Sequence, residues 1–471
     1  MNLRDALQVF SAEDSAVDKQ DALETQKTTD GNVGSTDTGT QNVVDAVNSV
    51  NEVKDVIDGV DTIEQGLGAA SEVDAAGDAV LEHADAVKPV LDSGVEPAEV
   101  NKAVEHVADI AASIGDTPQH ESYRLGLVSV EHSVDGMAYG QLAHEGMLQY
   151  GKKLHDTVVD ALTGAIVSSI KLVREYKAEK KGEYLDLTHI RKELREYNKN
   201  IVLDAATIKA DLQKWDNGMI IAYHTLYGTN TPMSMLKQSL NISAVANTID
   251  AVCKTIDTLV AIPKETLGDS ATLEKIQTAV VGLFKGVAVN DTTLAKLIGN
   301  SGTTVNGVRI VRSVTPKGLY IGTIAPAAND TGTFKGITST MHPYALTNDD
   351  VSTAIKFVTS VKDAVTSGNE ISNMKSEVDK YLAALITEGN KLDASISKLK
   401  AYISTLSGSE YANGKASIKY VRDIARIIGT GCISMALKDF VYVVGTVEDI
   451  FTAYADVAYD ASEKTSTTGT K

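Results

Sequence analysis

Seven glutamates near the N-terminus share a spacing that could mark sites for proteolysis. Of twelve Glu residues in 1–150, seven carry Ser, Ala or Gly two positions earlier, namely Glu13, Glu24, Glu72, Glu96, Glu105, Glu131 and Glu145. Only three of the thirteen Glu residues in 151–471 do so, although the abundance of small residues near the N-terminus explains part of the excess. The steps Ser129-Val130-Glu131 and Ala143-His144-Glu145 flank an abrupt change in composition. This pattern favours proteolytic processing near these residues, with the chain as a protease substrate.

Other residue patterns that could support catalysis are missing from the sequence. There is no G-x-G-x-x-G, H-E-x-x-H, G-x-S-x-G or paired C-x-x-C. Residues 408–415 resemble a phosphate loop but hold one residue too many, and Ala416 replaces the Ser or Thr that would bind magnesium. No two of the nine His residues lie three or four positions apart. The sequence therefore predicts a protein that is not an enzyme, with no cofactor and no metal.

The change in composition falls close to Glu131. Residues 1–131 contain 27 acidic and 7 basic side chains, whereas 132–471 contain 36 acidic and 37 basic ones. The whole net charge of −19 would argue against nucleic-acid binding, but it belongs almost entirely to the first segment. That segment also holds just two of the aromatic residues, Phe10 and Tyr123, so it lacks the large side chains that fill a core.

Length and cysteine usage bound the class of protein. A chain of 471 residues with 43% hydrophobic and 23% charged residues is expected to be globular, with a sizeable core. Cys253 and Cys432 lie in apolar helical contexts, which favours free thiols in a reducing compartment over a disulfide. The N-terminus does not read as a secretory signal, and no run of 18 uncharged apolar residues predicts a membrane-spanning helix.

The acidic segment contains two stretches that differ in their pattern of apolar residues. Residues 11–42 have no apolar period and are predicted to be disordered behind a short helix at 2–10. Residues 43–114 repeat Val, Ile and Ala at steps of three and four, which predicts helices. Because Val and Ala cover little area, such helices should be weak alone and firmer against a partner. Residues 1–131 are then either a permanent acidic bundle or coiled coil, or a removable addressing segment that is later discarded.

The remainder is predicted to form long amphipathic helices in two blocks, 132–300 and 346–461, followed by a disordered tail at 462–471. The individual helices are expected over about 146–180, 187–215, 237–262, 371–406 and 416–461. The last of these is apolar on more than one face, so we expect it at the centre of the bundle. Basic clusters at 171–181 and 191–199 are interleaved with acids, which is typical of solvated helix faces. If the acidic segment were removed, the remaining near-neutral chain, with these local basic clusters, could lie close to packed DNA.

Residues 301–345 differ from the helical blocks. Alternating β-branched residues separated by Pro-Gly and Asp-Gly type turns predict a small antiparallel β-meander, which could be a cap or a contact surface. The predicted fold class is mainly α: long amphipathic helices in a bundle, a small antiparallel β-meander insertion, and an acidic, partly disordered N-terminal segment.

This layout resembles the internal head proteins, or ejection proteins, of large tailed phages of the phiKZ type. The resemblance rests on an acidic N-terminal segment with several small-x-Glu steps ahead of a larger helical part. It implies that the acidic propeptide addresses the protein into the prohead and that a prohead protease cuts after Glu131 or Glu145, with Glu72, Glu96 and Glu105 as intermediate sites. The implied partners are that protease, capsid or scaffold proteins, other internal head proteins, packaged DNA and further copies of the chain. The implied location is the capsid interior, with the host cytoplasm during assembly and after ejection.

Two other functions fit the same sequence. One is a helical pore-forming or membrane-attacking protein, in which a β-tongue carrying Leu319, Ile321, Ile324 and Ile337 touches the membrane. The other is a coiled-coil scaffold or adaptor that keeps its acidic end permanently. An enzyme is the function least supported by these residues.

Overall fold

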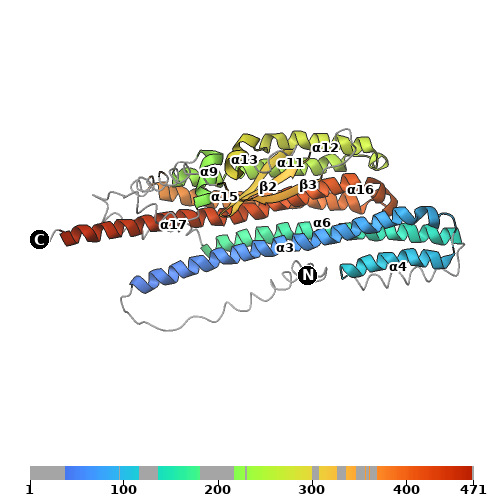
Figure 1. Ribbon diagram of the computed structural model, residues 1–471, viewed down its shortest axis with the longest axis horizontal. Coiled ribbons are helices and arrows are strands. Elements are labelled where there is room, and N and C mark those ends of the chain that lie inside the picture. The colour runs from blue at the N-terminus through green and yellow to red at the C-terminus, as the bar shows by residue number, and fades with distance from the viewer. Residues whose placement is uncertain are drawn as a thin grey trace.

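The protein is described by a computed structural model in which residues 38–94, 96–115, 136–180, 217–228, 231–299, 307–325, 336–345, 356, 360 and 369–468 can be placed. These residues form a mainly α-helical structure with one small antiparallel sheet, which confirms the predicted fold class. The long helices run along the longest axis of the molecule (Figure 1).

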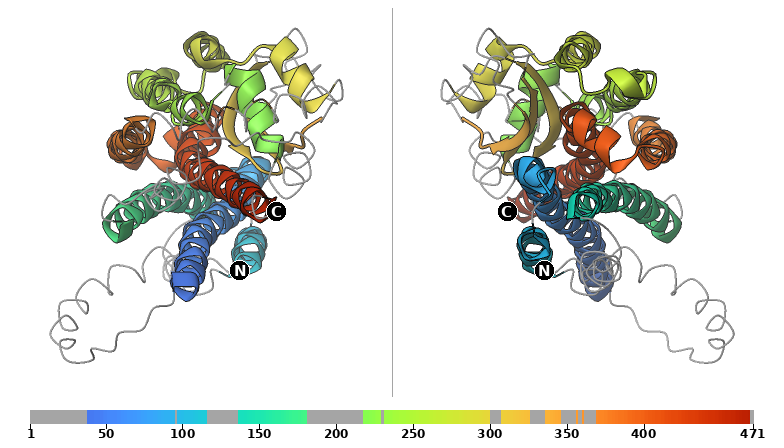
Figure 2. Two further views of the ribbon diagram at one scale, coloured as in Figure 1. Left: turned by 90° about the vertical axis from the view of Figure 1, so that its left-hand side faces the viewer. Right: turned by 90° about the vertical axis from the view of Figure 1, so that its right-hand side faces the viewer.

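The N-terminal part forms one layer of long helices. Helix α3 (Thr38–Leu91) and helix α6 (Gly136–Lys180) lie side by side and run in opposite directions, and the shorter α4 (Pro97–Ser113) packs against both (Figures 1 and 2). Helix α4 begins after Glu96 with Pro97 at its first position, where the missing N–H costs no hydrogen bond. The acidic segment therefore contributes two helices to the folded body.

The C-terminal part supplies the central helices. Helix α15 (Asn369–Ser404) lies beside α6, and a turn at Thr405 and Leu406 leads into α16 (Gly408–Asp423). A capping box starts α16, because the Ser407 hydroxyl accepts from the Glu410 N–H and the Glu410 carboxylate accepts from the Ser407 N–H. The chain continues without a break through a π-helical segment, η3 (Ile424–Thr430), into α17 (Gly431–Thr468).

A third set of short helices covers the other side of α15, α16 and α17 (Figure 2). In chain order these are α9 (Asn217–Tyr227), α10 (Pro232–Ser239), α11 (Ile242–Val260), α12 (Ser270–Phe284) and α13 (Asp291–Ile298), with 3-10 turns at Lys264–Thr266 and Lys285–Val287. Side-chain oxygens of Thr231, Asn241 and Asn290 accept backbone hydrogen bonds at the starts of α10, α11 and α13.

The β-meander comprises β1 (Val308–Thr315), β2 (Gly318–Ile324) and β3 (Ile337–His342), paired antiparallel in the order β1-β2-β3. A register shift between Val311 and Ser313 makes Arg312 a bulged residue. Gly318 has φ of 156° and lies against the His342 carbonyl, leaving no room for a Cβ. Strand β1 packs on α17, so the meander covers the central helix.

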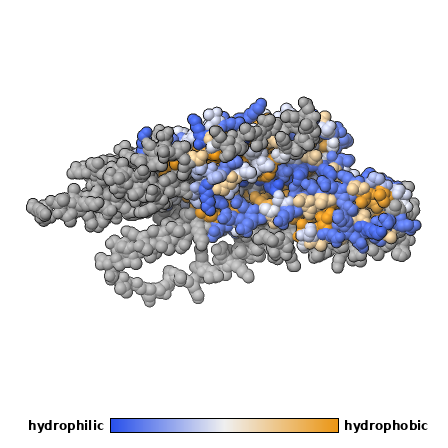
Figure 3. Space-filling model, in the orientation of Figure 1, coloured by the Kyte–Doolittle hydropathy of each residue, from blue (hydrophilic) through white to orange (hydrophobic). Residues whose placement is uncertain are grey.

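A single cluster of buried apolar side chains joins all of these layers. From α3 it includes Val60, Val80 and Leu81, each 0% exposed, and from α17 it includes Phe440 and Val447, also 0% exposed. On the face shown in Figure 3, the coloured residues are mostly hydrophilic, with smaller hydrophobic areas. Where burial is described, the apolar stripes of the helices are turned inward, including the Val- and Ala-rich stripe of the acidic segment from Val56 onward.

Some predicted boundaries were wrong. Helix α3 begins at Thr38, so 38–42 is helical instead of disordered, and α17 extends to Thr468, so 462–468 is helical as well. The polar composition of both stretches concealed helices that continue from apolar neighbours. The expected helix at 237–262 is interrupted, because α10 ends at Ser239 and α11 starts at Ile242. The predicted helices at 2–10 and 187–215, and most of the predicted disorder at 11–42, lie outside the described residues.

Candidate functional site

The internal cleavage candidates lie on or beside helices. Glu72 is exposed on α3, but the flanking Ala70 and Val73 are 5% and 3% exposed. Glu105 is exposed on α4, again beside buried neighbours, Ala103 and Val104. Because a protease binds its substrate as an extended strand, cleavage at either site requires local unfolding of the helix.

The other three candidate cleavage sites differ from one another in their structural surroundings. Glu96 is exposed and precedes α4, but the bond after it joins Pro97, which has no N–H. The step Ala143-His144-Glu145 lies within α6, where Ala143 is fully buried and His144 and Glu145 are half-buried. The step Ser129-Val130-Glu131 lies outside the described residues, between the end of α4 and the start of α6. Within the described residues, the candidate steps lie on different elements: Glu72 on α3, Glu105 on α4 and Glu145 on α6.

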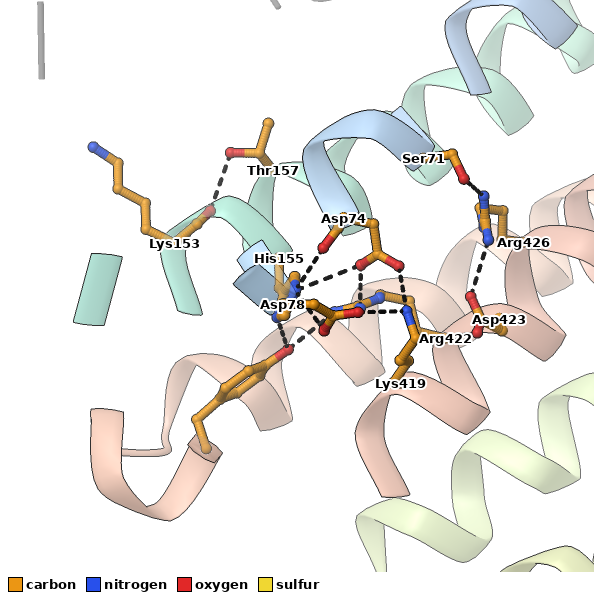
Figure 4. A network of polar contacts seen from close by, with 11 residues as sticks. Ser71, Asp74, Asp78, Lys153, His155, Thr157, Lys419, Arg422, Asp423 and Arg426 are labelled. Carbon is orange, nitrogen blue, oxygen red and sulfur yellow. Dashed lines mark hydrogen bonds and ion pairs between the residues drawn. The ribbon is translucent and has the colours of Figure 1, made fainter. Parts of the chain in front are cut away.

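A group of ionisable side chains, several of them deeply buried, lies where α3 meets α6 and α16 (Figure 4). Asp74 and Asp78 come from α3, His155 from α6, and Lys419 and Arg422 from α16. Arg422 is 0% exposed, His155 is 1% exposed and Asp74 is 3% exposed. Charged groups are almost never buried so deeply unless they are paired. We call these five residues, together with Tyr411 of α16, the buried polar cluster; the side chains of Lys419 and Asp78, at its edge, are 40% and 29% exposed.

Ion pairs cross the buried polar cluster from α16 to α3. The Arg422 guanidinium contacts the Asp74 carboxylate, and Lys419 Nζ lies 3.0 Å from Asp74 Oδ2 and 2.8 Å from Asp78 Oδ2. Burial opposes ionisation of Asp78, but hydrogen bonds from His155 and Lys419 outweigh burial and hold the pKa of this carboxyl well below its usual range. Two carboxylates and two cations therefore balance across the interface.

A chain of hydrogen bonds fixes the histidine. Arg422 Nη1 donates to the Tyr411 hydroxyl at 2.9 Å, and that hydroxyl lies 2.7 Å from His155 Nδ1. His155 Nε2 lies 3.2 Å from the Asp74 carbonyl, which can only accept, so Nε2 carries the proton and Nδ1 accepts from Tyr411. Burial, followed by the charge of Arg422, lowers the pKa of His155 even though Asp78 and Asp74 act the other way. His155 is therefore neutral in the folded protein.

The cluster depends on a close approach of α3 and α6. A Cβ on Gly77 would lie 2.5 Å from His155 Cδ2 and closer still to Nε2, so glycine is required where the ring crosses α3. A catalytic role would need a substrate to reach these groups, yet His155, Tyr411 and Arg422 are each no more than 1% exposed. Their arrangement instead ties the acidic helix to the body.

The ion pairs continue along α3 in antiparallel order. Beyond the cluster, Lys415 pairs with Asp85 at 3.0 Å, Arg426 contacts the Ser71 hydroxyl, and Lys438 pairs with Asp61 and, at 3.8 Å, with Glu64. We call the basic side chains of this row, Lys415, Lys419, Arg422, Arg426 and Lys438, the basic ladder. Four of its five side chains pair with carboxylates of α3, and Arg426 contacts a hydroxyl of α3 while pairing with Asp423.

A second buried carboxyl lies on α17. The Tyr223 hydroxyl of α9 donates to Asp439, and the backbone N–H of Val314 in β1 donates as well. Burial raises the pKa of Asp439 to about 8, so the acid is protonated at neutral pH. It joins α17 to α9 and to the sheet. Within the described residues, no group of three or more His, Cys, Asp or Glu side chains is placed to hold a metal ion.

The sequence analysis missed both buried sites, although faint signals were present. Arg422 sits in the apolar run I-K-Y-V-R-D-I-A, and Asp439 in L-K-D-F-V-Y. Asp74 follows Val73 on the stripe side of α3, and Gly77 interrupts an otherwise helix-forming segment. The resemblance of residues 408–415 to a phosphate loop was coincidental, because they form the capped first turns of α16.

Comparison with protein-family models, with curated proteins and with solved structures finds no match for this chain.

Proposed function

We propose that the chain is a non-enzymatic virion protein of a tailed phage, packaged inside the capsid, matured by proteolysis after Glu131 and ejected with DNA into the host. The observation that carries the proposal is the coincidence of three features in one interval. The acidic composition ends at residue 131, a small-x-Glu step ends there, and the interval lies between α4 and α6. A cut there separates the acidic part from the near-neutral part without severing a described helix.

Glu131 is favoured over Glu145 on structural grounds. Cleavage after Glu145 would sever α6 where Ala143, Met147 and Leu148 are 0–2% exposed. Cutting a buried helix requires opening the core around it, so a native-state protease should act elsewhere first.

The proposed partners follow from this role: the prohead protease, capsid and scaffold proteins, other internal head proteins, packaged DNA and further copies of the chain. The proposed locations are the capsid interior and, during assembly and after ejection, the host cytoplasm. The net charge of −19 disfavours contact between the intact chain and DNA, so the acidic segment would keep the two apart before packaging.

The test is the intact mass and N-terminal peptide map of the protein taken from its natural particle. A new N-terminus at His132 supports the proposal, and Glu131→Gln should abolish it while the matched Glu145→Gln leaves it in place. A full-length mass that starts at Met1 would contradict maturation. That result would favour an adaptor that keeps its acidic end permanently.

A pore-forming protein is the second candidate, and one observation favours it. Within the described residues, the stretch Gly408–Glu448 is long and apolar enough to cross a membrane by length and composition, but 83% of its most apolar window is buried inside the protein. The meander residues Leu319, Ile321, Ile324 and Ile337 are also buried, at 0–6% exposure. Membrane contact would require these surfaces to be uncovered. Leakage of dye from liposomes would support this candidate, and intact liposomes would remove it.

A further inference from the structure

We infer that the acidic module, defined as α3 and α4, remains bound to the rest of the protein after the chain is cut between α4 and α6. The groove formed by α6, α16 and α17 would then be a permanent docking surface for the acidic fragment. The inference builds on the proposed maturation but changes its outcome: the addressing segment is cut yet stays in the complex instead of being discarded.

The apolar seam between the two parts supplies the affinity. On the side of α3, Val60, Val80 and Leu81 are fully buried, and Val73 and Leu91 are 3% and 1% exposed. On α4, Val100, Val104 and Val107 are 0%, 4% and 2% exposed. All of these belong to the same buried cluster as the body, so separation would expose the whole stripe to water.

The buried ion pairs supply the register. A buried pair gains little net free energy over separated, hydrated charges, so the basic ladder should not be the main source of affinity. Displacement of α3 by one turn in the direction that places Ala70 opposite Arg422 would leave this cation buried without a carboxylate, which is strongly unfavourable. Displacement in either direction would also replace Gly77 with Val73 or Leu81 beside the His155 ring, where there is no room for a Cβ. The ladder therefore selects one alignment of α3 on α16 and α17.

Close contacts add a steric match. Gly140 of α6 lies against the Leu91 carbonyl, and a Cβ on Gly151 of α6 would lie 2.8 Å from Leu81 Cδ2. Together with Gly77 against His155 and Gly59 against Leu172, these glycines let α3 and α6 approach closely at several points along their contact. A generic acidic helix would not reproduce this fit, which makes the chain's own acidic module the partner that the groove accepts.

Retention has a consequence for nucleic-acid contact. Lys415, Lys419 and Lys438 each pair with a carboxylate of α3, and Arg422 is fully buried against Asp74. While the module stays bound, these cations are paired with carboxylates of α3, although the side chains of Lys415 and Lys419 are still 32% and 40% exposed, and the complex keeps the charge of the uncut chain. The acidic segment therefore continues to disfavour contact between the matured protein and DNA.

The experiment uses the full chain with a recognition sequence for a site-specific protease inserted between Glu131 and His132. After complete cleavage, the sample is diluted to about 100 nM, where a complex of micromolar affinity dissociates, and its mass is measured by native mass spectrometry. We expect a complex containing one copy of each fragment, which separates only in denaturant. Two free fragments under native conditions would overturn the inference.

A matched pair of variants tests the interface. Val60→Asp places a charge at a fully buried position of α3 and should weaken fragment association by about 100-fold or more, because an unpaired buried charge is costly. Val90→Asp makes the same change at a position that is 49% exposed on the same helix and should leave association unchanged. Equal effects of the two variants would show that the apolar contacts of α3 with the rest of the protein are not the source of the affinity. The engineered cut is informative even if the natural chain is never cleaved, so retention and maturation can fail independently.

Discussion

The contact between Gly77 and His155 leads to a prediction that compares two glycines of the same helix. Gly77→Ala would place a methyl group 2.5 Å from His155 Cδ2, whereas a Cβ on Gly68 would meet no atom within 4 Å. Both substitutions lie inside α3 and both should gain about 1 kcal/mol of helix propensity. Any difference between the two variants therefore reports the packing of α3 against α6.

The size of that difference follows from the surroundings of the ring. His155 is held on both nitrogens, by Tyr411 and by the Asp74 carbonyl, so it cannot rotate away without losing those hydrogen bonds. Overpacking of a core typically costs about 1–3 kcal/mol, and a buried polar group left unpaired adds about 1–3 kcal/mol. After the propensity gain, Gly77→Ala should destabilise by about 1–5 kcal/mol, while Gly68→Ala should stabilise by about 1 kcal/mol.

The assay is urea unfolding followed by far-UV circular dichroism, with hydrogen exchange of α3 as a local measure. We expect the midpoint of Gly77→Ala to fall, with faster exchange in α3 and α6, and the midpoint of Gly68→Ala to rise. Equal stabilities for the two variants would refute the close packing of α3 on His155. That result would also remove the argument that the acidic segment belongs to the folded body.

Three further predictions concern buried ionisable groups. Arg422→Gln removes the fully buried cation of Asp74, leaving only the partly exposed Lys419 to pair with it, and should destabilise by about 3–5 kcal/mol. Lys88→Gln, at an ion pair whose lysine is 53% exposed, should change stability by less than about 0.5 kcal/mol, and similar urea midpoints for the two variants would contradict the buried pair. The pKa of His155 is lowered from 6.5 in the folded state, so the unfolded chain binds more protons and the free energy of unfolding should fall as pH drops below 6.5. His155→Gln should make the free energy of unfolding less dependent on pH in this range, and an unchanged pH dependence would count against a neutral buried ring. The pKa of Asp439 is raised from 3.8 to about 8, so its contribution to the free energy of unfolding is fully present below pH 3.8 and is lost as pH rises towards 8. Asp439→Asn should make the free energy of unfolding less dependent on pH over that range. A variant with the pH dependence of the wild type would show that the acid is not buried as a neutral group.

The periodicity of the sequence predicted much of the fold. The three- and four-residue steps of Ile371, Met374, Val378 and their successors correspond to α15, and the alternating residues of 305–341 correspond to the three strands. The prediction works for α15 because its apolar residues recur with the helical period, and for the strands because β-branched residues are separated by turn signals. Helix ends were less predictable, because polar residues at 38–42 and 462–468 continue a helix without adding to its apolar stripe.

The candidate site could not be predicted in the same way. Arg422 and Asp74 are 348 residues apart in the chain, and an apolar stripe shows that a helix has a partner without showing which one. The acidic segment is rich in Val and Ala, so it was expected to need a partner, yet nothing in its composition places that partner in the same chain. Its carboxylates resemble a solvated face until α16 and α17 supply the matching cations.

The most direct test of the account is absolute quantification of peptides from α3 and α17 in purified natural particles, together with the N-terminus of the larger fragment. The account predicts an N-terminus at His132 and equal molar amounts of peptides from the two helices, because the cut acidic module stays bound. Particles in which the larger fragment begins at His132 but peptides of α3 are absent would contradict retention. An uncut chain that begins at Met1 would contradict the proposed maturation itself.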